Sequence, residues 1–178
     1  MRIYVINIIT PAYNRLKLLL RAVNGALAQT IEDCEVIVVD DCSLEVIDLP
    51  EHPLLRIIRL TKNHGGLAAR NIDIKAAKGR WIDFSDDDDK LLPHMAEVSL
   101  KALQQSSLPK LVGAISGIEV ANREGKVIQT RIQPALPCDS HYGLEDIDPF
   151  RSFLYKQTSY VPYRDRSIYY KKLRLNWF

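Results

Sequence analysis

The stretch GGLAARNIDIKAAKGRWIDFSDDDD, residues 65–89, decides the fold, because it joins a helix, a strand and an acidic run without a break. Residues 65–79 have the composition of a helix, and Gly79 is a natural left-handed cap for its end. Residues 80–85 form an apolar, aromatic run that predicts a strand, and this strand leads directly into four aspartates. A helix followed at once by a buried strand is typical of α/β proteins.

The same alternation precedes this stretch. Residues 2–10, 34–41 and 54–60 are near-continuous apolar runs rich in β-branched residues, which predicts strands buried on both faces. Residues 15–30 place their leucines, valine and alanine at the spacing of one helical face, and Asn14 can cap this helix. Strands and helices that alternate with short connections predict an α/β fold, a mainly parallel doubly wound sheet flanked by helices with right-handed crossovers.

The pattern changes after Pro93, which stands at the first position of a helix predicted over residues 93–107. Residues 110–122 and 125–133 are strand-like runs separated by a turn, so we expect an antiparallel hairpin added to the parallel sheet. Residues 144–157 suggest a short helix. We expect one domain over residues 1–178, with a nucleotide-binding-like half up to Pro93 and a more irregular half from residue 94.

Composition sets limits on the class of protein. The chain has 178 residues, of which 47% are hydrophobic and 26% charged, and this suits a single globular domain. The net charge of +2 does not argue for a nucleic-acid partner. Three cysteines without metal-ligand spacing support neither a disulfide framework nor a zinc site, so a reducing, cytoplasmic setting fits. The N-terminus resembles a first strand and not a signal peptide, and no apolar window is long enough to span a membrane.

The chain from Arg151 onwards is basic and rich in tyrosine. Such a segment suits an anionic membrane surface or a phosphate-bearing ligand, so peripheral contact with a membrane is one hypothesis. A solvated surface whose tyrosines cover the core is the other.

Polar side chains follow three of the predicted strands. Thr10 and Tyr13 follow the first, Asp40 and Asp41 end the second, and the four aspartates follow the fourth. In open α/β sheets, ligands bind outside the carboxyl ends of the strands. Because core burial does not require polar residues there, we expect a binding site at this edge.

The four aspartates repel one another unless water or a cation screens them. Carboxylate oxygens suit Mg²⁺ or Mn²⁺, and Mg²⁺ is usually held by one or two carboxylates together with substrate phosphates. In an extended segment Asp86 and Asp88 point one way and Asp87 the other, so Asp86 and Asp88 are the candidate pair for one cation. An EF-hand loop is excluded, because Lys90 and Leu91 stand where an oxygen ligand and a glycine belong.

Other candidate residues have simpler interpretations. Periodicity alone favours a surface arginine at Arg70 over a binding residue. His64 and His94 lack ligand-spaced partners, so we interpret both as structural or solvated. Glu145 and Asp146 are either helix-terminus acids or a general base.

Three blocks of the sequence together resemble a known protein family. IITPAYNRLKLLLRAVNGALAQTIEDCEVIVVDDCS, NHGGLAARNIDIKAAKGRWIDFSDDDD and LLPH follow in order and at ordinary spacing. Residues 3–93 thus resemble the family 2 glycosyltransferases of the GT-A fold. The resemblance implies an inverting enzyme that transfers a sugar from a nucleotide-diphosphate donor, with uridine as the usual base, to a glycan or lipid-linked acceptor hydroxyl. It also implies Mg²⁺ or Mn²⁺ on the donor diphosphate.

The resemblance also implies roles for particular residues. The block that contains Thr10, Pro11 and Tyr13 matches the motif that lines the nucleobase; Asp41 matches a base contact and Arg70 the arginine beside it. The aspartate motif places Asp86 on the ribose and diphosphate, Asp87 among the donor contacts, and Asp88 on the metal. Cys42 stands where the family usually has glycine.

No residue can be matched to the general base of the family. The base normally lies in a later acidic motif, so we expect it beyond Phe178 and expect only part of an acceptor-side half. The first hypothesis is an active enzyme of bacterial polysaccharide or lipopolysaccharide assembly, peripheral to the inner membrane. The second is a shortened remnant that binds the nucleotide-sugar without turnover. The third, a nucleotidyltransferase, should have a glycine-rich loop after the first strand, and TPAYNR has no glycine. A hydrophobic face left uncovered could also favour a homodimer.

Overall fold

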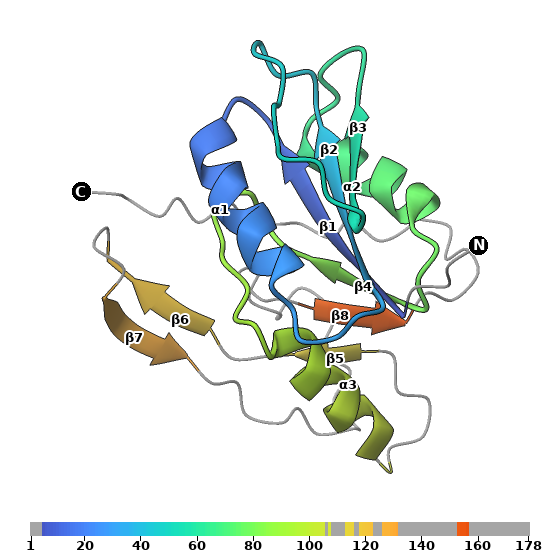
Figure 1. Ribbon diagram of the computed structural model, residues 1–178, viewed down its shortest axis with the longest axis vertical. Helices are drawn as coiled ribbons and strands as arrows, with labels where there is room; N and C mark the ends of the chain where they lie inside the picture. Colours follow the sequence, from blue (N-terminus) through green and yellow to red (C-terminus); the bar gives the residue numbers. More distant parts are fainter. Residues whose placement is uncertain are drawn as a thin grey trace. The chain divides into compact units, whose positions relative to one another are not determined.

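The computed structural model describes residues 5–105, 107, 113–115, 118–122, 126–131 and 153–156. Its main sheet has six strands in the order β3-β2-β1-β4-β8-β5 (Figure 1). Four of them are parallel: β1 (Ile6–Ala12), β2 (Cys34–Asp40), β3 (Leu55–Arg59) and β4 (Trp81–Phe84). This confirms the parallel α/β sheet that the apolar runs predict.

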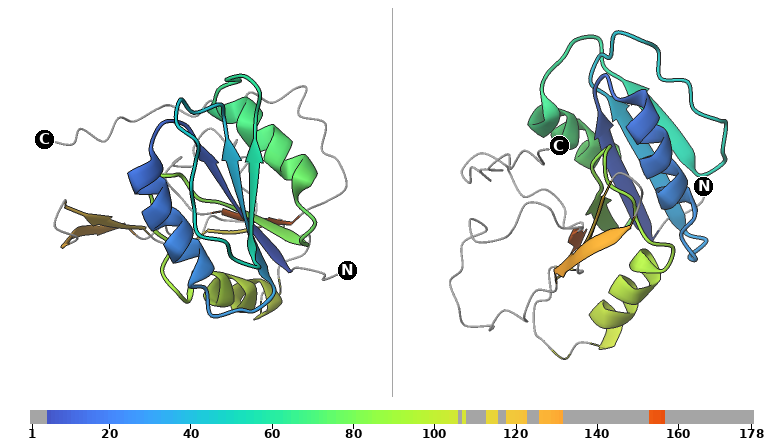
Figure 2. Two further views of the ribbon diagram at one scale, coloured as in Figure 1. Left: turned by 45° about the horizontal axis from the view of Figure 1, so that its top comes forward. Right: turned by 90° about the vertical axis from the view of Figure 1, so that its left-hand side faces the viewer.

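Helices cover both faces of the parallel strands (Figure 2). α1 (Leu16–Leu27) and α3 (Met95–Gln105) pack on the face that carries Ile6 and Ile8. α2 (Gly66–Ala76) lies on the other face, where Ile9 contributes to a second cluster. Because side chains alternate along a strand, β1 needs apolar residues at nearly every position to fill both layers.

A buried polar network lies near the amino ends of the parallel strands, at the opposite end of the sheet from the aspartates. The Asn7 side chain is fully buried; its Oδ1 accepts hydrogen bonds from the backbone N–H groups of Lys78 and Gly79. Its Nδ2 donates to Glu35 Oε2 at 2.5 Å, and Glu35 in turn pairs with Arg56 at 3.2 Å. Gly79 does not have the left-handed conformation that we expected of a cap. It is needed because an added Cβ would lie 2.7 Å from Asn7 Oδ1.

The strands after α3 differ from the prediction in detail. The run at 110–122 divides into β5 (Gly113–Ile115) and β6 (Ile118–Ala121). β6 pairs with β7 (Val127–Arg131) as the expected antiparallel hairpin, but the hairpin forms a two-stranded sheet of its own. The helix expected over residues 144–157 is wrong for residues 153–156. They form a strand, β8 (Phe153–Lys156), which pairs antiparallel with β4. This pairing satisfies backbone groups that β4 would otherwise leave open at a sheet edge.

Contacts divide the chain into two units. Met1–Ala114 and Ser152–Gln157 form the first unit, which holds α1, α2, α3 and the parallel strands. Ile115–Arg151 and Thr158–Phe178 form the second, which holds the β6–β7 hairpin. No helix in the part of the chain that the structure describes is long and apolar enough to cross a bilayer. The tyrosine-rich segment after Lys156, and Glu145 and Asp146, lie outside the described residues.

Candidate functional site

The end of β1 supplies the first part of the candidate site. Tyr13 is 45% exposed just beyond the strand, so its ring is available to a ligand. Pro11 is half-buried, whereas Thr10 is fully buried and its Oγ1 has no hydrogen-bond partner among the described residues. In this conformation Thr10 offers no surface to a nucleobase, and its expected contact stays a prediction.

The loops that follow β1 and β2 are joined by hydrogen bonds. The Asn14 backbone N–H donates to Ser43 Oγ at 2.9 Å, and the Leu44 N–H donates to Asn14 Oδ1 at 2.8 Å. Asn14 has a φ of 55°, a left-handed conformation that asparagine tolerates better than most residues. The exchange of hydrogen bonds therefore holds the turn after β1, and with it Tyr13, against the loop after β2.

Asp41 fixes the start of α2. It is 3% exposed, and its carboxylate accepts the backbone N–H groups of His64 at 2.8 Å and Gly65 at 2.7 Å. Its carbonyl oxygen accepts a hydrogen bond from Asn63 Nδ2 at 3.2 Å. Sequence reasoning missed this structural role, since the two partners are 23 and 24 residues away along the chain. The base contact expected of Asp41 stays a prediction.

Arg70 and Asp86 lie together although the second half of α2 and the whole of β4 separate them along the chain. Arg70 projects from α2, and one of its terminal nitrogens is paired with Asp86 Oδ1. The Arg70 side chain is only 19% exposed, so it is not the surface arginine that periodicity alone favours. The structure therefore brings two of the predicted donor-binding residues to the same edge.

The aspartates form a turn and not an extended segment. We refer to residues 86–89 as the acidic turn; it is closed by a hydrogen bond from the Asp89 N–H to the Asp86 carbonyl at 3.1 Å. The prediction that Asp87 points away from Asp88 is consequently wrong. Both carboxylates meet the same guanidinium, with Arg15 NH1 3.1 Å from Asp87 Oδ1 and 3.1 Å from Asp88 Oδ2.

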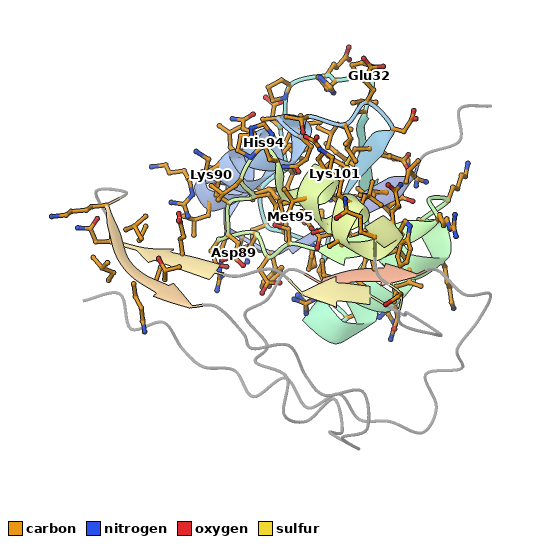
Figure 3. All side chains as sticks on the ribbon, turned by 90° about the horizontal axis from the view of Figure 1, so that it is seen from below. Glu32, Asp89, Lys90, His94, Met95 and Lys101 are labelled. Atoms are coloured by element: carbon orange, nitrogen blue, oxygen red, sulfur yellow. The ribbon has the colours of Figure 1, made fainter. Side chains whose placement is uncertain are left out.

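Two arginines that sequence reasoning missed contact the acidic turn. Arg15 precedes α1, and Arg21 lies in the helix and donates to the Asp88 carbonyl oxygen at 2.7 Å. Figure 3 shows the loop of Asp89 and Lys90 running past α1. A signal was present in the sequence, since Arg15 follows the first strand at the same edge as the aspartates.

The pKa values of two buried carboxyl groups are raised. Burial raises the pKa of Asp87 to about 6; the Arg15 charge opposes the rise and the Asp88 charge adds to it. Burial, with a further contribution from the Asp89 charge, raises the pKa of Asp83 to about 7. Asp83 lies in β4 on the same face as Thr10, and neither of its carboxylate oxygens has a hydrogen-bond partner in the described part of the chain.

The candidate metal ligands remain accessible. The Asp86 and Asp88 side chains are 44% and 27% exposed, and both present hard oxygen atoms. Among the described residues, no group of three or more His, Cys, Asp or Glu side chains could hold a metal ion. Two accessible carboxylates fit Mg²⁺ or Mn²⁺ only where phosphate oxygens and water complete the coordination.

Comparison with known proteins identifies the family of the chain. Residues 7–170 match glycosyl transferase family 2. The chain belongs to this family. It is 33% identical over 129 residues to the succinoglycan biosynthesis protein ExoO of Rhizobium meliloti, covering 70% of this chain and 36% of that protein. It is 36% identical over 106 residues to the putative colanic acid biosynthesis glycosyl transferase WcaA of Escherichia coli, covering 56% of this chain and 38% of that protein. The chain thus spans well under half the length of these two family 2 relatives.

Solved structures of other glycosyltransferases share the fold. S. aureus TarS superposes with a TM-score of 0.55 at 20% identity, covering 85% of this chain and 28% of TarS. The mannosyltransferase PcManGT from Pyrobaculum calidifontis, solved with GDP-Man and Mn²⁺, gives a TM-score of 0.52 at 21% identity, covering 65% of this chain and 36% of PcManGT. These likenesses show that this family 2 chain has the GT-A fold.

Proposed function

We propose that this family 2 chain binds a nucleotide-diphosphate sugar, with a UDP-sugar as the first candidate, at the carboxyl edge of its parallel strands. The observation that carries the proposal is the meeting of Tyr13, Asp41, Arg70 and the acidic turn at that edge. These residues come from four separate segments, and core packing does not require polar residues there. Family membership supplies the reaction class, the transfer of a sugar to an acceptor.

We assign each of these residues to a different part of the donor. The exposed Tyr13 ring offers a flat apolar surface for a nucleobase, in a turn that is hydrogen-bonded to the loop after β2. Arg70 holds Asp86 from the α2 side, and this pair supports assigning the Asp86 carboxylate to the ribose and diphosphate. Asp87 lines the turn from its buried side, and Asp88, with Asp86 as the second candidate ligand, offers an accessible carboxylate to Mg²⁺ or Mn²⁺.

The bound cation would act as a Lewis acid that neutralises charge on the departing diphosphate. In an inverting transfer, the acceptor oxygen forms a bond to the anomeric carbon while the bond from that carbon to the diphosphate breaks. A general base takes the proton of the acceptor hydroxyl. No described residue is assigned to the base. We propose an acceptor in bacterial polysaccharide assembly, because relatives are named for succinoglycan and colanic acid biosynthesis.

Calorimetric titration of UDP into the full chain tests the donor site. We expect binding with Mn²⁺, loss of at least about tenfold in affinity with EDTA, and a similar loss in Asp88→Ala. Asp48→Ala, which removes an exposed acid outside the site, should bind like the wild type. GDP serves as the comparison nucleotide, since PcManGT was solved with GDP-Man.

The result separates the candidate functions. Metal-dependent UDP binding followed by release of UDP from a UDP-sugar in the presence of acceptor supports transfer. Binding without release supports the alternative of a nucleotide-sugar-binding protein. Failure of both nucleotides to bind under any condition would contradict the proposed donor site.

A further inference from the structure

The acidic turn is neutralised by arginines of the protein itself. Arg70 is paired with Asp86, and Arg15 NH1 is 3.1 Å from both Asp87 Oδ1 and Asp88 Oδ2. Three of the four carboxylates therefore have a cationic partner. This arrangement explains how adjacent aspartates are tolerated in a partly buried turn, because each guanidinium offsets the repulsion between them.

The two arginines are held differently. The Arg70 side chain is 19% exposed and projects from within α2, so neighbouring atoms restrict it. Arg15 is the residue before the first turn of α1, and its side chain is 49% exposed. Arg15 can therefore leave Asp88 with little rearrangement of the protein. It need not leave Asp87, whose side chain is only 10% exposed and would be costly to leave without a partner.

The Arg15 guanidinium contacts the carboxylate of Asp88, which is the metal ligand of the proposed donor site. A divalent cation bound to Asp88 Oδ2 would lie within a few ångströms of this positive charge. Two cations at such a separation repel, and no described carboxylate other than those of the acidic turn contacts Arg15. The Arg15–Asp88 pair and a metal bound at Asp88 therefore compete for one carboxylate.

We infer that Arg15 is a built-in counter-ion of Asp88 that competes with the divalent cation, so that the nucleotide-free chain binds the metal weakly. This inference rests on the proposed function, since that function assigns Asp88 to the metal. It adds that metal binding requires Arg15 to give up its contact with Asp88.

The inference is tested by the Mn²⁺ affinity of the full chain without nucleotide. Titration calorimetry and the electron paramagnetic resonance signal of free Mn²⁺ measure this affinity. Arg15→Gln should bind Mn²⁺ at least about tenfold more tightly than the wild type, or about 1.4 kcal/mol. Arg15→Lys keeps the positive charge and should stay within about threefold of the wild type. Lys17→Gln is the matched control: it removes an equal charge from an exposed position on α1 and should also change the affinity by less than about threefold.

The outcomes separate this inference from the proposed donor site. Equal or weaker Mn²⁺ binding by Arg15→Gln, with UDP and Mn²⁺ still binding together to the wild type, overturns the competition and leaves the donor site standing. Similar tightening in Lys17→Gln also overturns it, because the effect would then be one of net charge. Absence of Mn²⁺ binding in every variant, with and without UDP, overturns both.

Discussion

At the scale of single residues, Asp83 breaks the ordinary rule that buried polar groups are hydrogen-bonded. It has no exposed surface, and neither carboxylate oxygen has a partner among the described residues. Thr10 Oγ1 in β1 and Ser85 Oγ, in the residue that follows β4, also have none. An ionised carboxylate there would lack both water and a counter-charge, and for this reason burial raises the pKa of Asp83 to about 7.

The raised pKa makes stability depend on pH. In the unfolded chain an aspartate titrates near pH 3.9, so between about pH 4 and pH 7 the folded chain binds more protons and loses stability as the pH rises. Asp83→Asn removes this loss. We expect the variant to match the wild type near pH 4 and to exceed it at pH 8 by at most about 4 kcal/mol in the free energy of unfolding. Urea denaturation at both pH values measures the difference.

The control for this prediction is Asp48→Asn, which removes an exposed carboxylate. Its difference from the wild type should stay within about 0.5 kcal/mol and should not change with pH. A difference between Asp83→Asn and the wild type that is the same at pH 4 and pH 8 would show that folding does not raise the pKa of Asp83.

Cys42 has a φ of 66°, in the left-handed region that favours glycine. A residue with a Cβ loses about 1–2 kcal/mol there, whereas glycine loses about 0.4–1 kcal/mol through the greater freedom of the unfolded chain. We therefore expect Cys42→Gly to stabilise the protein by about 0.5–1 kcal/mol in urea denaturation. Cys42→Ala keeps the Cβ and removes only the thiol, so it should gain nothing. Equal stability of the two variants would mean that the strain relieved by glycine does not exceed the entropic cost of glycine.

At the scale of elements, the close approach of the segment before β4 to β1 depends on Gly79. A Cβ at residue 79 would lie 2.7 Å from Asn7 Oδ1 and 3.0 Å from the Asn7 backbone nitrogen. Because Asn7 is itself fixed by hydrogen bonds, we expect Gly79→Ala to cost about 2–3 kcal/mol of unfolding free energy. In Gly66→Ala the Cβ would meet only Arg70 NH1 at 3.6 Å, so this control should cost less than about 1 kcal/mol. Similar losses in both variants would contradict the steric explanation.

The strands and helices of the first 105 residues were predictable because their signals are local. The apolar run of β2 and the one-sided leucines of α1 need no knowledge of distant residues. Gly79 shows where local signals end. The sequence marked the glycine, but it is needed because of its close contact with Asn7, 72 residues away. β8 was missed for a related reason, since a short aromatic run becomes a strand only where the edge of β4 is available.

The candidate site was predictable to the same extent. The rule that ligands bind at the carboxyl ends of parallel strands drew attention to this edge, where Arg70 and Asp86 are paired. The turn at Asp87 and Asp88 was missed because alternation assumes an extended backbone. Arg15 was missed because the pattern around it reports a helix start, whereas its partners lie 72 and 73 residues further along the chain.

At the scale of the whole molecule, the proposed donor site lies within the first unit, and the β6–β7 hairpin belongs to the second. A ligand that binds only the folded first unit stabilises that unit by about 2.7 kcal/mol when its concentration is 100 times its Kd. Hydrogen exchange of the full chain with saturating UDP and Mn²⁺ can therefore report the two units separately. We expect amides of β1, β2 and β4 that exchange by unfolding to slow by up to about 100-fold, and those of the hairpin by less than about threefold.

Asp88→Ala is the control for the exchange experiment, because it removes the proposed metal ligand and leaves the strands intact. Its amides should exchange at the same rates with and without UDP and Mn²⁺ in both units. Equal slowing of the hairpin and the parallel strands in the wild type would mean that the two units unfold together. The hairpin then depends for its stability on the donor site, although its only strand pairing in the described part of the chain is between β6 and β7. Selective slowing would mean that a donor can order the first unit while the second exchanges freely.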